Sequence, residues 1–137
     1  MPHCVIEYTD NLREVGQIPE LLPKINRILM AQDGAFPIAG IRSRAIALHD
    51  WCMADGAADY AFVHITLKIG AGRSEAVKDR TCNAIFDMVK DHFAVLFAQR
   101  YLALSMELAE FSEAGTWKHN NVHARFARPV QGATPNR

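Results

Sequence analysis

The sequence predicts an α/β protein of the α+β two-layer sandwich kind, in which tandem β-α-β units form a four-stranded main sheet with two helices on one face. The order strand–helix–strand occurs twice along the chain, over about 2–56 and 59–112. Each unit brings its two strands parallel through a right-handed crossover. The similar length of the two units indicates a duplication. We expect both units to belong to a single domain, 1–127.

The first unit begins with a weakly alternating strand over 3–8. Leucine and isoleucine then recur at helical spacing over 19–31. Pro23 lies inside this pattern, so the helix either starts at Pro23 or kinks there. Alternation returns over 41–50, which predicts the strand that completes the unit.

The second unit begins with the clearest strand of the chain, over 60–69. Ser74 is a suitable N-cap for a helix that reaches roughly Gln99, and a clean strand follows over 101–108. A short extra strand is expected within 117–126.

Composition excludes several classes of protein. Lys plus Arg total 15, as do Asp plus Glu, so the basic excess of a nucleic-acid-binding protein is missing. No apolar run approaches the roughly 18 residues needed to span a bilayer, and the start of the chain lacks the order of a secretory signal. We therefore expect a cytoplasmic protein with Cys4, Cys52 and Cys82 as reduced, buried thiols. The segment 128–137 has the composition of a disordered tail.

The strongest candidate for catalysis is the α-amine of Pro2. Initiator methionine is usually removed before a small residue, and removal of Met1 would leave a secondary amine at the start of the chain. A free α-amine has a pKa of about 7.7–8, and burial or a nearby cation lowers it. Such an amine takes up and returns protons near neutral pH. If Met1 is retained, this base is absent, and many chains begin Met-Pro without a catalytic amine.

Two arginines are candidate carboxylate-binding groups. Arg42 lies in the run GIRSR at the start of a predicted strand, and Arg73 lies in GAGRS, where a strand gives way to a helix. A guanidinium holds a carboxylate by two parallel hydrogen bonds, and the helix N-terminus beside Arg73 adds backbone donors. A substrate with several carboxylates would suit both residues. Taken alone, each also fits a solvated surface residue, and Arg44 ranks below Arg42.

Other motifs point to no further chemistry. His119 and His123 lie outside any helical pattern and have no third ligand, so we expect no metal site. The run GAG at 70–72 lacks the third glycine of a dinucleotide-binding fingerprint.

The sequence resembles the 5-carboxymethyl-2-hydroxymuconate isomerase family of the tautomerase superfamily, up to about Phe126. The second unit also resembles short relatives of the 4-oxalocrotonate tautomerase type. Pro23 and the tail depart from the family pattern. The matching stretches are Met1-Pro2-His3, GIRSR at 40–44, MADG at 53–56, DYAFVHITLKIGAGRS at 59–74 and NNVHARF at 120–126.

The resemblance implies a tautomerase-like fold assembled as a homotrimer, with Pro2 as the catalytic base and Arg42 and Arg73 as substrate-binding residues. It implies a small polycarboxylate substrate, no cofactor, and no nucleic-acid or membrane partner. The implied reaction converts 5-carboxymethyl-2-hydroxymuconate to 5-carboxy-2-oxohept-3-enedioate in the bacterial breakdown of homoprotocatechuate, itself formed from 4-hydroxyphenylacetate. Two alternatives remain open: a tautomerase of another enol, and a non-enzymatic ligand-binding protein of the same fold.

Overall fold

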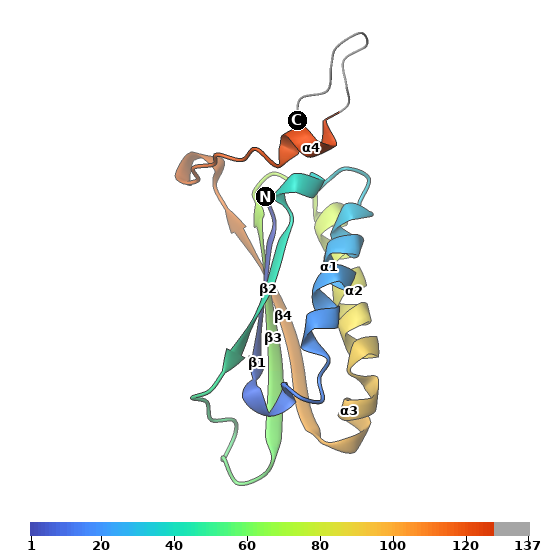
Figure 1. Ribbon diagram of the computed structural model, residues 1–137, viewed down its shortest axis with the longest axis vertical. Coiled ribbons are helices and arrows are strands. Elements are labelled where there is room, and N and C mark those ends of the chain that lie inside the picture. Colours follow the sequence, from blue (N-terminus) through green and yellow to red (C-terminus); the bar gives the residue numbers. More distant parts are fainter. Residues whose placement is uncertain (128–137) are drawn as a thin grey trace.

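The computed structural model describes residues 1–127, in which a single sheet is flanked by helices (Figure 1). The strands are β1 (His3–Thr9), β2 (Arg42–Leu48), β3 (Tyr60–Gly70) and β4 (Tyr101–Phe111). The α-helices are α1 (Ile18–Met30), α2 (Glu75–His92), α3 (Ala94–Gln99) and α4 (His123–Phe126), and the 3-10 helices are η1 (Asp10–Leu12), η2 (Ile38–Gly40) and η3 (Glu113–Gly115).

The sheet has the strand order β2-β1-β3-β4. Strand β1 pairs parallel with β2, and β3 pairs parallel with β4, so each unit is a β-α-β crossover. The central strands β1 and β3 run antiparallel, which places the start of one unit at the end of the sheet opposite to the start of the other. Helices α1, α2 and α3 all cover the same face (Figure 1). The predicted fold class is confirmed.

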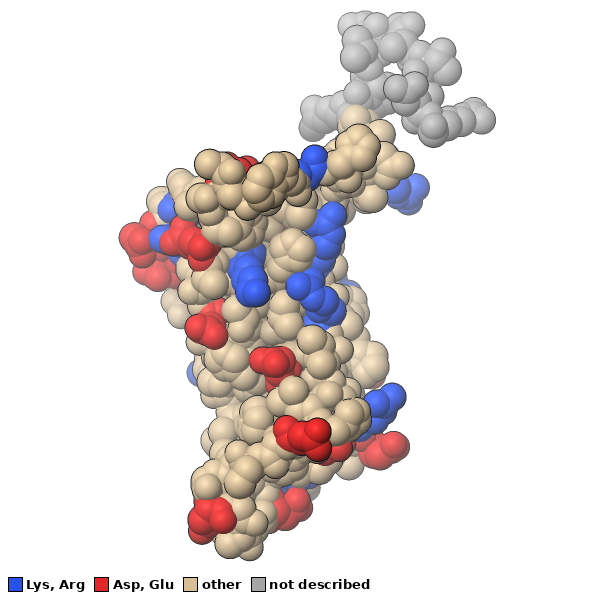
Figure 2. All heavy atoms as spheres, turned by 90° about the vertical axis from the view of Figure 1, so that its left-hand side faces the viewer, with Lys and Arg blue, Asp and Glu red and all other residues tan. Residues whose placement is uncertain are grey.

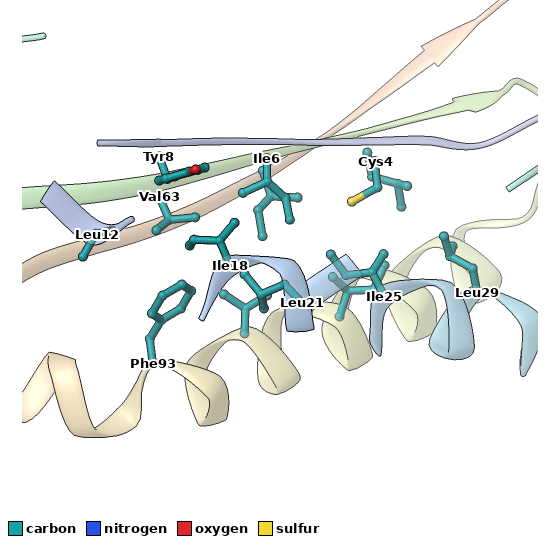
Figure 3. Packing of buried hydrophobic residues seen from close by; sticks show 14 of the residues in the cluster. Cys4, Ile6, Tyr8, Leu12, Ile18, Leu21, Ile25, Leu29, Val63 and Phe93 are labelled. Atoms are coloured by element: carbon teal, nitrogen blue, oxygen red, sulfur yellow. The ribbon is translucent and has the colours of Figure 1, made fainter. Parts of the chain in front are cut away.

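The core lies between this face and the two long helices. Alternate residues of β1, namely Cys4, Ile6 and Tyr8, point toward α1 (Figure 3). Leu21 and Ile25 of α1 meet them and are fully buried. Burying one such side chain contributes about 1.5–3 kcal/mol, so the apolar stripes of the helices hold the two layers together.

The opposite face of the sheet, which we call the open face, is covered by no helix of the described part of the chain (Figure 1). Its charges are unevenly distributed: Lys and Arg side chains gather in the upper half of the view, and the lower half carries mainly Asp and Glu (Figure 2). The strand register explains the basic half, because His3 of β1 lies between Arg42 of β2 and Lys68 of β3. Apolar residues also reach solvent on this face, where Ile46 is 47% exposed.

Helix α1 begins at Ile18, so the alternative in which it starts at Pro23 is wrong. Gln17 precedes the helix in a left-handed conformation, with φ of 49°, and makes no side-chain capping bond. Pro19 lies in the first turn, where a missing N–H is harmless. Pro23 lies inside the helix and removes the N–H that would bond the carbonyl four residues earlier.

Helix α2 is capped as predicted. The Ser74 hydroxyl accepts a hydrogen bond from the Val77 N–H at 3.2 Å. The helical segment expected to reach Gln99 is divided at Phe93, which separates α2 from α3. The Phe93 side chain is fully buried, so the division keeps its ring in the core.

The strand expected within 117–126 is wrong, since the described chain has no strand there and α4 occupies its last four residues. The polar groups of Asn120 explain the difference. Its amide nitrogen donates to the Ala39 carbonyl at 3.1 Å, and its amide oxygen accepts from the Val122 N–H at 2.7 Å. These bonds fold the segment over η2 instead of extending it along a strand.

Two further expectations concern the cysteines and the tail. Cys4 is buried and Cys82 is half-buried, but Cys52 is exposed, so the prediction of three buried thiols is wrong for Cys52. Burial raises the pKa of the Cys4 thiol to about 12. The predicted disordered tail, 128–137, lies outside the described residues. Within residues 1–127, none of the helices has the length and apolar character to cross a membrane.

Candidate active site

The amino terminus lies at the end of the sheet where β1 and β2 begin and β3 ends, beside η2 and α4 (Figure 1). Pro2 is buried, and its carbonyl accepts a hydrogen bond from the Arg42 N–H at 3.0 Å. Met1 packs against η2: a Cβ added at Gly40 would lie 3.3 Å from the Met1 Cα. The lack of a side chain at Gly40 therefore makes room for the first residue of the chain.

Arg73 reaches this end of the sheet from the turn between β3 and α2. Its Nε and Nη2 donate to the Ala35 carbonyl at 3.0 and 2.9 Å, and its Nη1 donates to the Gly70 carbonyl at 2.9 Å. The guanidinium carbon lies 4.4 Å from the centroid of the Phe36 ring. Three of the five guanidinium N–H groups are thus held by the backbone. Within the described residues the other two make no hydrogen bond, so they are free for an anion.

Arg42 reaches the same end from the first position of β2. Its Nη1 is buried and has no hydrogen-bond partner within residues 1–127. A buried donor without a partner is rare, because leaving it unpaired costs about 1–3 kcal/mol. A carboxylate placed against this nitrogen would satisfy it.

The electrostatics of this end lower the pKa of the terminal amine, which in this structure is that of Met1. Burial is the largest cause, followed by the positive charges of Arg73 and Lys118. Glu113 opposes the shift, and Arg42 adds a smaller effect in the same direction as the other cations. An amine here is therefore neutral at a lower pH than an exposed one.

Neighbouring groups respond to the same field. Burial, Arg44 and Arg42 lower the pKa of His3. Arg44 lies 3.1 Å from His3, measured between its Nη1 and the imidazole Nδ1. Arg44 thus contacts His3 on the open face. Arg42 is the arginine whose backbone N–H donates to the Pro2 carbonyl.

The structure therefore brings together three sequence candidates that are far apart in the chain: the amino terminus that precedes Pro2, Arg42 and Arg73. Their roles in binding and catalysis stay predictions. The described residues contain no group of three or more His, Cys, Asp or Glu side chains arranged to hold a metal ion.

Sequence reasoning missed two further charged residues at this end. The Lys118 ammonium pairs with a carboxylate oxygen of Glu113 at 2.9 Å. The other Glu113 oxygen would lie 2.9 Å from a Cβ added at Gly70. Glu113 lies in η3, and Lys118 lies in the segment for which the sequence wrongly predicted a strand, so sequence periodicity gave no correct signal for their position.

Two tandem β-α-β units that form one four-stranded sheet, with the helices on one face, define a protein of the tautomerase fold. The fold is shared with a solved wild-type fused 4-OT, described as a symmetric trimer, at 19% identity and a TM-score of 0.59, covering 85% of this chain and 93% of that one. At this identity the likeness establishes the fold alone.

The chain belongs to the family described as 5-carboxymethyl-2-hydroxymuconate isomerase, whose sequence model matches residues 2–126. It is 49% identical over 126 residues to the 5-carboxymethyl-2-hydroxymuconate Delta-isomerase of Escherichia coli, covering 92% of this chain and 99% of that relative. A crystal structure of a 5-carboxymethyl-2-hydroxymuconate isomerase from Deinococcus radiodurans R1 is 55% identical, with a TM-score of 0.88, covering 93% of this chain and 95% of that one. The chain is accordingly an enzyme that interconverts keto and enol groups.

Proposed function

We propose that the chain converts 5-carboxymethyl-2-hydroxymuconate to 5-carboxy-2-oxohept-3-enedioate without a cofactor, using the α-amine of Pro2 as general acid and base. The observation that carries this proposal is the position of the amino terminus, beside Arg73 and Arg42 and with a lowered amine pKa. The family relationship supplies the substrate.

Removal of Met1 serves two purposes in this proposal. It converts the Pro2 nitrogen from an amide into a basic amine, one residue further into the buried end of the sheet. It also clears the space beside Gly40, where the Met1 Cβ and Cγ lie 3.7 Å from the position of an added Cβ. The substrate would enter the region that Met1 fills.

In the proposed reaction the substrate carboxylates bind Arg42 and Arg73. Neutral Pro2 removes the proton of the 2-hydroxyl group and leaves a dienolate, whose negative charge the two guanidinium groups stabilise. Protonated Pro2 then returns the proton to a carbon further along the conjugated chain, which gives the 2-oxo product. One proton leaves oxygen and one reaches carbon, so no redox partner is required.

The test has three parts. Mass spectrometry of the purified protein is expected to show a chain that lacks Met1, and Pro2→Ala is expected to lower kcat about tenfold or more, because a primary amine replaces the secondary one. Acylation of the terminal amine of the wild-type chain should abolish turnover. Full activity in a preparation that retains Met1 would contradict the proposal.

The two alternatives are separated by a spectrophotometric panel of 2-hydroxydienoates and simple enols. An enzyme for another enol would prefer a monocarboxylate such as a phenylpyruvate-type ketone, and a ligand-binding protein would turn over none of them. The unpartnered Nη1 of Arg42 and the two free N–H groups of Arg73 favour a substrate with at least two carboxylates. We propose that the reaction serves homoprotocatechuate breakdown in the cytoplasm, which adjacency to genes for aromatic-ring cleavage would support.

We further propose that the chain works as a homotrimer. The open face leaves apolar side chains such as Ile46 in solvent, although its strands are long enough to pack against a second layer. Burial of this face between copies of the chain would remove that surface from water. Light scattering coupled to size-exclusion chromatography should give three times the chain mass, and a monomer would contradict the proposal.

A further inference from the structure

Lys118 occupies a defined place at the edge of the candidate site. Its segment is tied down by the bond from Asn120 to the Ala39 carbonyl, next to the glycine that contacts Met1. Its ammonium group is held by Glu113 at 2.9 Å. The Lys118 side chain is 39% exposed, whereas Arg42 and Arg73 are half-buried. Lys118 therefore stands at the rim of the site, with the two arginines further inside.

Glu113 already places a carboxylate at this position. One of its oxygens bonds Lys118, and the other approaches the backbone at Gly70. The same added Cβ at Gly70 would lie 3.8 Å from Nη1 of Arg73. The Glu113 carboxylate is thus paired with Lys118, and it is near enough to Arg73 for its negative charge to oppose the lowering of the pKa of that guanidinium by burial.

The charges at this end do not balance. Arg42, Arg73 and Lys118 provide three positive side chains near the terminal amine, and Glu113 is the carboxylate that acts on this amine. Glu110 also acts on Arg73, but it is paired with Lys78 at 3.0 Å. The substrate of the proposed function carries three carboxylates: two on its conjugated muconate frame and one on a flexible carboxymethyl arm. Planar, rigid carboxylates suit the fork of a guanidinium, whereas a mobile arm suits the point charge of a flexible lysine.

We infer that Lys118 is a specificity-determining residue, which binds the carboxylate of the carboxymethyl arm after that carboxylate displaces Glu113. The inference rests on the proposed function, because the number of substrate carboxylates comes from it. Glu113 holds the Lys118 ammonium at 2.9 Å, near enough to the terminal amine for its positive charge to lower the pKa of that amine. When substrate binds, one carboxylate replaces another on the same lysine, and Arg42 and Arg73 hold the two carboxylates of the frame.

The experiment compares two substrates that differ only in the arm: 5-carboxymethyl-2-hydroxymuconate and 2-hydroxymuconate. It is made at a pH on the upper plateau of the pH–rate profile, where the amine is neutral in every variant. Lys118→Ala is expected to lower kcat/KM for the tricarboxylate about tenfold, the scale of one hydrogen bond to a charged group. For 2-hydroxymuconate the change should be less than about twofold, because no arm is lost.

Two variants serve as matched tests. Glu113→Gln should lower KM for the tricarboxylate, because Lys118 no longer exchanges one carboxylate for another. Lys90→Ala removes a lysine of α2 that pairs with Asp87 at 3.4 Å, and should leave both substrates unchanged.

The outcomes distinguish this inference from the proposed function. If the wild-type enzyme turns over neither substrate, the proposed function fails. If it turns over both but Lys118→Ala affects them equally, or affects neither, the role of Lys118 in recognising the arm is overturned. A loss confined to the tricarboxylate supports it.

Discussion

The two β-α-β units share one topology but differ in the residues that precede and begin their strands. In the first unit Pro2 precedes β1 and Arg42 begins β2. In the second unit Asp59 precedes β3 and Arg100 precedes β4. Because the central strands are antiparallel, these two sets of residues lie at opposite ends of the sheet.

At the second end a protein carboxylate neutralises the arginine. Asp59 pairs with the Arg100 Nη2 at 3.3 Å, and Asn11 donates to Asp59 at 3.4 Å and to the Tyr60 carbonyl at 2.8 Å. At the first end no carboxylate of the described residues pairs with Arg42, whose buried Nη1 has no partner. Arg100 also has an unpartnered buried nitrogen, its Nε, so the difference between the two ends is the carboxylate of Asp59. The duplicated frame therefore provides two similar ends, and the side chains at the strand starts decide which of them can bind an external anion.

The largest expected difference is between Arg73→Ala and Arg100→Ala. Loss of Arg73 removes three backbone contacts and a proposed substrate contact, so we expect kcat/KM to fall about 100-fold and the free energy of unfolding to fall about 2–4 kcal/mol. Loss of Arg100 breaks one ion pair with the exposed carboxylate of Asp59 and should cost about 1 kcal/mol, with kcat/KM unchanged. Steady-state kinetics and urea unfolding measure both. Equal loss of activity in the two variants would remove the functional distinction between the ends.

Arg42→Ala should lower activity without lowering stability. Because its Nη1 bonds nothing in the described chain, its removal deletes no hydrogen bond of that nitrogen, whereas a substrate carboxylate loses its partner. We expect kcat/KM to fall about tenfold and the Tm not to fall, because the unpaired buried donor is removed. Arg44→Ala is the neighbouring control, and a larger loss of activity in that variant would reverse the order assigned to the two arginines.

The pH dependence of kcat/KM tests the electrostatics of the first end. Burial and the nearby cations lower the pKa of the Met1 amine, and they are expected to act in the same direction on the Pro2 amine once Met1 is removed. The base is then neutral further into acid, so kcat/KM should rise with pH through its pKa and level off above it. Lys118→Ala removes a positive charge that disfavours the protonated amine, so the pKa rises and the acid limb moves to higher pH. Glu113→Gln should move the acid limb to lower pH, because it removes a negative charge that favours the protonated amine.

Asp59→Asn is the control, because Asp59 lies at the other end of the sheet. The acid limb should not move in this variant, and a shift would contradict the local origin of the effect.

The smallest effects concern how the two long helices begin. Ser74→Ala removes the capping bond of α2 and should cost about 1 kcal/mol of unfolding free energy. Helix α1 has no such bond, and Gln17 adopts a positive φ that glycine adopts more easily. Gln17→Gly should therefore stabilise the chain by about 0.5 kcal/mol. Urea unfolding measures both changes, and a destabilised Gln17→Gly variant would show that the glutamine side chain matters to the helix start.

The elements that the sequence predicted well are those whose side chains meet the core at regular spacing. The strand of 60–69 and the Ser74 cap are confirmed, because alternation and capping depend on residues that are close together in the chain. For Pro23 the sequence left two alternatives, since a proline fits either a helix start or a kinked interior. In the structure the helix starts at Ile18, directly after Gln17 in its left-handed conformation.

By itself the sequence determined the two repeated units, the order of strands and helices, and the arginines worth testing. Only the tertiary structure decided that Lys118 and Glu113 lie at the amino-terminal end, that Cys52 is exposed, and that 117–126 folds over η2. The physical reason is the distance along the chain between the residues that interact. Hydrophobic periodicity records which side chains face a core, whereas a bond such as that from Asn120 to Ala39 joins residues 81 positions apart and leaves no period in the sequence.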